Sequence, residues 1–235
     1  MAAKKRPFYI VHQDKDIFVV DKPAGLLAVP IPGSNVKNLS GLVADHLGKH
    51  GVRVGTVHRI DRYTSGLMVF AKNKRAYDGL YQKFRDHKPG RTYLAVVRGV
   101  MEENEGVLEH HLKLVKKGFR NIVVDPREEE AAPARLSYRV KERFQSATLV
   151  EIQLDTGLKN QIRVQFKQIG HQLVGDRHYA PEEKKEQLIN RQALHASQLQ
   201  FLHPRNNRSV QFEAKIPADM LRLIDHYRWV KETRS

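Results

Sequence analysis

Short apolar runs bounded by turn-forming residues recur along this chain, and they predict several strands. The run at 67–71 is apolar throughout, which indicates a buried strand. A run at 108–124 alternates apolar and polar residues around a Lys-Lys-Gly turn at 116–118, as expected of a hairpin. The other predicted strands cover 17–21, 91–99, 134–140 and 147–154, the last two as an antiparallel pair.

Apolar residues recur at helical spacing in four other segments. Ser40, Asn73 and Asn160 are the predicted N-terminal caps of the first three helices, Gly170 ends the third, and the fourth covers 218–230. The predicted core-facing residues of the last three helices are Ala76, Leu80 and Phe84, then Ile162, Phe166 and Ile169, then Met220, Ile224 and Tyr227.

The charge balance indicates a polyanionic partner. Lys and Arg number 41 against 26 Asp and Glu, which gives a formal net charge of +15. Nucleic acid is the first candidate for that partner. An anionic membrane is the rival, but no segment approaches the ~18 consecutive apolar residues of a spanning helix, so we expect no membrane partner.

The chain contains no cysteine, which excludes disulfides, thiolate metal sites and a cysteine nucleophile. Its basic first residues are not followed by the apolar segment of a secretory signal, so we expect a cytoplasmic protein. At 235 residues the chain is long enough for one domain with a sizeable core, or for two small lobes that share one. We expect a single catalytic domain over 1–235.

A charged, turn-rich segment leads directly into the buried strand at 67–71. Asp61 lies in this segment between Arg59 and Arg62, and the turn formers at 64–66 follow it. We therefore expect Asp61 on a loop just ahead of the strand. On local grounds alone, it could simply be a solvated carboxylate paired with neighbouring arginines.

Two other segments carry candidate chemistry. The turn at 22–25, Lys-Pro-Ala-Gly, closes the strand at 17–21, and such a turn either carries backbone towards a ligand or simply ends a strand. Arg163 is predicted in the first turn of a helix, where the helix dipole opposes a cation. Arg163 should therefore have a specific anionic partner, and any nearby carboxylate would serve.

Several of these stretches together resemble a known family. The string His-Arg-Ile-Asp-Arg-Tyr-Thr-Ser-Gly-Leu at 58–67 is similar to the His-Arg-x-Asp-x-x-Thr-Ser-Gly-Leu signature of the RluA-like pseudouridine synthases. Other motifs of that family resemble 21–26, 91–95, 157–163 and 170–179. Two positions depart from its pattern, since Leu158 stands where Arg is usual and Asn160 where His is usual. These departures bear on the substrate more than on the chemistry.

The resemblance implies roles for particular residues. It makes Asp61 the catalytic residue, stacks Tyr93 on the target base, and pairs Arg163 with Asp61. It also implies that Arg59 helps to flip the base out of its stack. The further residues expected to bind the RNA are His58, Arg62, Lys22 and Ile162. The strand by itself leaves open that Tyr93 is an ordinary core aromatic.

The resemblance also implies a fold and a partner. The fold is an α+β domain with a mixed, mostly antiparallel central sheet, flanked by helices and loops around a basic cleft. The partner is RNA, either rRNA or tRNA, and no cofactor or metal is implied; the scattered histidines also lack zinc-ligand spacing. Because a strand is predicted at 17–21, we expect no N-terminal S4 RNA-binding domain. We expect a monomer.

A single carboxylate suits the isomerisation of uridine to pseudouridine, in which the N1–C1′ bond breaks, the uracil rotates and C5 bonds to C1′. A glycosidase would need two carboxylates, and only Asp61 is found near the signature. Three roles for Asp61 stay open, namely attack on C1′, attack on C6, or removal of the 2′ proton. Two competing functions are an inactive RNA-binding module of the same ancestry and a DNA-binding protein, although no helix-turn-helix stands out.

Overall fold

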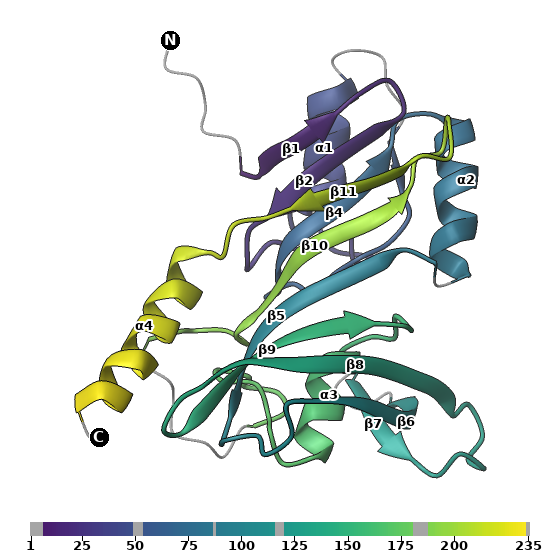
Figure 1. Cartoon of the computed structure of the whole chain (residues 1–235). Coiled ribbons are helices and arrows are strands. Elements are labelled where there is room, and N and C mark those ends of the chain that lie inside the picture. The colour runs from purple at the N-terminus through teal and green to yellow at the C-terminus, as the bar shows by residue number, and fades with distance from the viewer. Residues whose placement is uncertain (1–6, 49–53, 87, 116–119, 181–187, 234–235) are drawn as a thin grey trace. The chain divides into compact units, whose positions relative to one another are not determined.

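The computed structural model describes residues 7–48, 54–86, 88–115, 120–180 and 188–233. The chain divides into two compact units (Figure 1). The first unit is built from Met1–Pro89 and Ala196–Lys215, and the second from Gly90–His195 and Ile216–Ser235. Each unit has strands, helices and an apolar core of its own.

Antiparallel strands form the frame of the first unit. They are β1 (Tyr9–Gln13), β2 (Ile17–Lys22), β3 (Gly55–Thr56), β4 (Ser65–Ala71), most of β10 (Leu194–Leu202), and β11 (Ser209–Glu213). β2 lies between β1 and β4, β3 pairs with β4, and β11 pairs with β10. β2 and β4 are in register from Ile17 opposite Ala71 to Lys22 opposite Gly66. Every residue of β4 is buried, as its apolar run predicts.

Two helices, α1 (Leu39–Gly48) and α2 (Lys74–Arg85), belong to the first unit. Asn73 caps α2 as predicted, because its side chain accepts the Ala76 N–H at 2.9 Å. The predicted apolar stripe of α2 packs in one cluster with β2 and β4. The cap predicted for α1 is wrong by two residues. Asn38, rather than Ser40, accepts the Gly41 N–H at 3.0 Å, since the helix begins at Leu39.

Among the described residues, five strands of the second unit form a run of antiparallel pairs. In spatial order they are β5 (Gly90–Arg98), β9 (Ala147–Leu154), β8 (Ala132–Arg143), β6 (Glu105–Val115) and β7 (Arg120–Val124). The predicted hairpin is confirmed by the β6–β7 pairing, although its turn at 116–118 lies outside the described residues. The predicted antiparallel pair at 134–140 and 147–154 is confirmed as β8 and β9.

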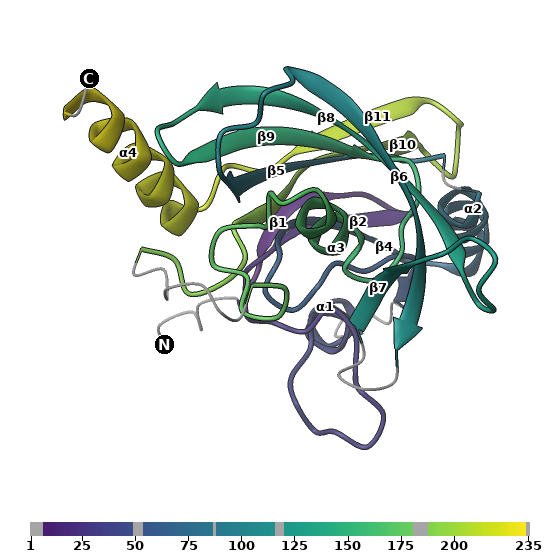
Figure 2. The same ribbon diagram turned by 90° about the horizontal axis from the view of Figure 1, so that it is seen from below.

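Helices α3 (Gln161–Gln168) and α4 (Ala218–Thr233) complete the second unit. α3 packs against β6 and β7, which can be followed in Figure 2. α4 buries Met220, Ile224 and Tyr227 among apolar residues of β5 and β9, as predicted. Gly170, with φ +79°, follows α3 and allows the His171 N–H to reach the Phe166 carbonyl at 2.9 Å, which ends the helix as predicted.

The α+β class and the mostly antiparallel strand pairing are thus confirmed. β1 was not predicted. It is an edge strand that alternates between exposed and half-buried residues, so it has no apolar run to reveal it. None of the described helices is long and apolar enough to cross a membrane. The single domain and the basic cleft stay predictions.

Candidate active site

Asp61 lies on the loop that precedes β4, in the first unit, where the sequence places it. The loop closes on itself, because the Thr64 N–H donates to the Asp61 carbonyl at 3.1 Å. Asp61 is half-buried, whereas Arg59 and Arg62 are exposed. The carboxylate therefore sits at the surface of a closed turn, with two cations beside it in the sequence.

Lys22 is hydrogen-bonded to the backbone of this loop and of the turn after β2. Its side chain is 0 % exposed, and Nζ donates to the carbonyls of Pro23 at 3.0 Å, Leu26 at 2.9 Å and Arg62 at 3.0 Å. The fully buried ammonium fixes the backbone of the residue that follows Asp61. The expectation that Lys22 binds RNA directly stays a prediction.

The turn after β2 also braces the Asp61 loop. The Gly25 N–H donates to the Arg62 carbonyl, and Arg62 Nε donates back to the Gly25 carbonyl, both at 2.9 Å. One residue before Lys22, Asp21 accepts the Gly66 N–H. Burial raises the pKa of Asp21, although that hydrogen bond and the Lys22 charge oppose the rise. The turn at 22–25 therefore holds the loop that carries Asp61 in place. That it also carries backbone towards a ligand stays a prediction.

His58, predicted to contact RNA, is engaged with the first unit's own core. Its Nε2 accepts the Val69 N–H at 3.0 Å, and its ring stacks on Phe84 with centroids 4.4 Å apart. Because Nε2 is the acceptor, a proton on the neutral ring belongs on Nδ1. The half-buried ring therefore ties the segment before Asp61 to β4 and α2.

Gly66 explains why a glycine ends the Thr-Ser-Gly turn. Its φ is +115°, and a Cβ at this position would lie 2.2 Å from the carbonyl oxygen of Ala196 on β10. No other residue fits without moving the backbone. The start of β4, and with it the loop that carries Asp61, is thereby packed directly against its neighbour.

Tyr93 lies on β5 in the second unit, opposite Ile152 of β9, and is 7 % exposed. Arg91, two residues earlier, reaches the carbonyls of Leu154 at 3.5 Å and Asp155 at 3.4 Å. Burial lowers the pKa of Arg91, although the nearby Tyr93 and Asp155 oppose the fall. The guanidinium is thus hydrogen-bonded to the end of β9 and the start of the loop between β9 and α3.

Arg163 has the anionic partner that its place in the first turn of α3 demands, and that partner is Asp176. Nε and Nη2 of Arg163 donate to the two carboxylate oxygens at 2.6 and 2.8 Å. The two side chains are 6 % and 1 % exposed. Asp176 also accepts the N–H groups of His178 at 3.0 Å and Tyr179 at 3.2 Å. The sequence reasoning missed Asp176, although 170–179 was recognised as a motif. The pairing of Arg163 with Asp61 stays a prediction.

The start of α3 is built differently from the prediction. Asn160 is the N-cap residue by position, but its φ is +56° and its side chain makes no cap hydrogen bond. Oε1 of Gln161 instead accepts the Leu158 N–H at 3.0 Å and the Thr156 hydroxyl at 2.8 Å. Ile162, predicted to bind RNA, is 4 % exposed, which places it in the core of the second unit.

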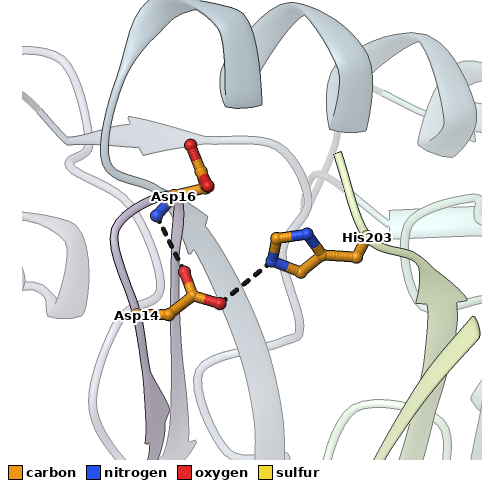
Figure 3. Close-up of side chains that lie close together, drawn as sticks. All are labelled: Asp14, Asp16 and His203. Carbon is orange, nitrogen blue, oxygen red and sulfur yellow. Dashed lines mark hydrogen bonds and ion pairs between the residues drawn. The ribbon is translucent and has the colours of Figure 1, made fainter. Parts of the chain in front are cut away.

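One group of side chains among the described residues has the spacing of a metal site. Asp14, Asp16 and His203 bring their ligand atoms within 4.8 Å of one another (Figure 3). Both oxygens of Asp14 are already engaged, one by the N–H groups of Asp16 and Ile17 and the other by the rings of His12 and His203. The group therefore has the bonding of a structural cluster that ties the β1–β2 turn to the end of β10.

The sequence profile described as RNA pseudouridylate synthase matches residues 16–168, which is more than half of the chain. The chain belongs to this family, which confirms the resemblance drawn from the motifs. It is therefore a pseudouridine synthase, an isomerase.

Curated relatives agree with this assignment. The chain is 41% identical over 224 residues to the "Uncharacterized RNA pseudouridine synthase YlyB" of Bacillus subtilis (strain 168), covering 93% of this chain and 72% of the relative. It is 37% identical over 228 residues to the "Ribosomal large subunit pseudouridine synthase D" of Zymomonas mobilis, covering 91% and 71%. Among solved structures, "Human RNA Pseudouridylate Synthase Domain Containing 4" matches with a TM-score of 0.76 and 25% identity over 94% of this chain and 93% of that one.

Proposed function

We propose that this protein isomerises specific uridines in structured RNA, with the Asp61 carboxylate as the catalytic group. The observation that carries the proposal is the bracing of the Asp61 loop. Lys22, Asp21 and Gly25, from β2 and the turn after it, bond to the backbone of Arg62 and Gly66, on either side of the turn that follows Asp61. Such pre-organisation is what a catalytic group needs and what a solvated surface carboxylate does not.

The proposed isomerisation needs one catalytic carboxylate. The N1–C1′ bond breaks, the uracil turns so that C5 faces C1′, the C5–C1′ bond forms, and C5 loses its proton while N1 regains one. Asp61 begins this sequence by attacking C1′ or C6, or by removing the 2′ proton.

The target base must leave its stack before it can react. Arg59 is exposed and stands two residues before Asp61, which supports a role in filling the gap that the base leaves. Tyr93 offers a flat ring for the flipped base.

Arg163 is proposed as the partner that orients Asp61. Its side-on pair with Asp176 uses Nε and Nη2. The bond to Asp176 fixes the plane of the guanidinium, which is the condition for directional pairing with Asp61.

Large-subunit rRNA is the favoured substrate, because relatives that are 37% and 34% identical carry the name "Ribosomal large subunit pseudouridine synthase D". A tRNA is the alternative substrate. We expect the enzyme to work in the cytoplasm as a monomer without metal or cofactor.

Mapping pseudouridine in total RNA from cells with and without the gene tests this proposal. We expect defined uridines in rRNA to lose the modification when the gene is absent, and to regain it when purified protein is added to that RNA. Identical maps, together with RNA binding by the purified protein, would favour an inactive RNA-binding module instead.

A further inference from the structure

We propose that a pocket between the β1–β2 turn and the β10–β11 turn is a second RNA site, which holds a backbone phosphate remote from the target uridine. The inference rests on the proposed function for its ligand. The cavity measures about 610 Å³ and belongs entirely to the first unit. Its lining includes His12, Lys15, Arg205, Arg208 and Phe212.

The negative charges of the two carboxylates in this pocket, Asp14 and Asp16, are offset by hydrogen-bond donors and a cation of the first unit. Burial pushes the pKa of Asp14 up, but the N–H groups of Ile17 and Asp16 and hydrogen bonds from His12 and His203 outweigh it and lower that pKa to about 2. Asp16 forms an ion pair with Arg205, and the resulting hydrogen bond is the main reason why its pKa is also lowered.

Lys15 and Arg208 supply the remaining positive charge. Both side chains are exposed at the rim, and among the described residues neither forms an ion pair. His12 lies over Phe212, with ring centroids 5.1 Å apart, so an aromatic surface lies beside the two cations. Cations beside an aromatic surface are typical of a site that binds a strand of nucleic acid.

A metal cation fits the same pocket poorly. Arg205 already donates to one oxygen of Asp16 and Asn73 to the other. Each oxygen of Asp14 has two donors, of which Figure 3 shows the Asp16 N–H and the His203 ring. A divalent ion would have to displace these bonds and then sit beside a guanidinium, whereas a phosphate at the rim displaces nothing.

The pocket and Asp61 lie at opposite ends of one strand. Asp16 adjoins the Ala71 end of β4, since its carbonyl accepts the Lys72 N–H at 2.8 Å, and Asp61 precedes the other end. β4 has seven residues, so at ~3.3 Å per residue the two ends are about 20 Å apart. At the rise of about 3.4 Å per nucleotide along the axis of a duplex, that length corresponds to roughly six phosphates of one strand. The pocket should therefore contact RNA several nucleotides from the reacting base.

The test compares the double variant Lys15→Glu, Arg208→Glu with the parent, using fluorescein-labelled polyuridylate of 25 and of 4 nucleotides. The control is Arg222→Glu, an exposed charge reversal on α4. Losing this one phosphate contact should reduce the slope of log K against log salt by about 0.7 for the long oligomer. The slope for the short oligomer should stay as in the parent, because it cannot span both positions. An unchanged slope for the long oligomer, or an equal change in the control, would overturn the proposal.

Activity provides a second readout. On an RNA that the parent modifies, the double variant should raise KM and leave kcat unchanged, and a fall in kcat with constant KM would overturn the inference. Titration with Mn²⁺ alone should show no site that His203→Ala removes, and such a site would identify the pocket as a cation site. If the parent modifies no RNA at all, the proposed function fails, while the salt slopes still decide whether the pocket binds RNA.

Discussion

Lys22→Met removes the buried ammonium under the Asp61 loop and keeps a side chain of similar length. The carbonyls of Pro23, Leu26 and Arg62 then lose the donor that Lys22 provides, although the Arg62 carbonyl keeps its bond from the Gly25 N–H. The substitution therefore leaves two half-buried carbonyls without that donor and loosens the backbone next to Asp61.

The size of the effect follows from these groups. Each carbonyl left without its donor lowers the free energy of unfolding by about 1–3 kcal/mol. Removing the Lys22 charge offsets part of this loss, because the folded state no longer has to bury an ammonium. We expect a net destabilisation of about 2–4 kcal/mol, or a melting temperature lowered by roughly 5–15 °C for a chain of this size. Below that temperature the rate of single-turnover pseudouridine formation should still fall, because Asp61 is less well fixed.

Thermal melts and single-turnover rates on the modified RNA measure both effects. Lys72→Met is the matched control, since the Lys72 ammonium donates to one carbonyl, that of Asp14, at the far end of β4 from Asp61. The control should lose less stability and keep its rate. A Lys22→Met protein with the parent's melting temperature and rate would refute the bracing argument.

Three further variants test other parts of the structure. Gly66→Ala places a Cβ 2.2 Å from the backbone of β10, so we expect a loss above about 3 kcal/mol or no folded protein; a normal melt would show that the contact is wrong. Arg163→Lys loses the bidentate bond to Asp176, so stability should fall by about 1–3 kcal/mol and most turnover should disappear, while near-normal turnover would contradict the proposed hold on Asp61. The pKa of Asp14 is lowered in the folded state from 3.8 to about 2, so its stabilisation is complete above pH 4 and is lost as the pH falls towards 2. Urea unfolding should therefore show Asp14→Asn weaker by about 1–2 kcal/mol at pH 7 and equal to the parent near pH 2, and a constant difference would count against this reasoning.

Features that depend on residues close together in the chain could be predicted from local patterns in the sequence. The buried run of β4, the Asn73 cap and the stripe on α4 each involve residues a few positions apart, and each is confirmed. Asp61 was placed correctly on its loop for the same reason, because the turn formers at 64–66 directly precede the strand.

Contacts between distant residues could not be predicted in this way. Lys22 bonds to a carbonyl 40 positions away, and Arg163 bonds to Asp176 across 13 positions that include the end of a helix. The sequence showed that Arg163 needs an anion but not which carboxylate the fold brings to it. Lysine is a residue type that commonly binds RNA phosphates, and the sequence does not show that Lys22 is buried. The pairing of β2 with β4 shows it.

The most direct test of the account replaces Asp61 by Asn, which is nearly isosteric but cannot act as nucleophile or base. We expect pseudouridine formation on the cognate RNA to fall below detection, while RNA affinity is kept and stability changes by no more than about 1–3 kcal/mol. Activity within a fewfold of the parent, measured on the same RNA preparation, would show that Asp61 is an ordinary loop carboxylate and would contradict the central claim.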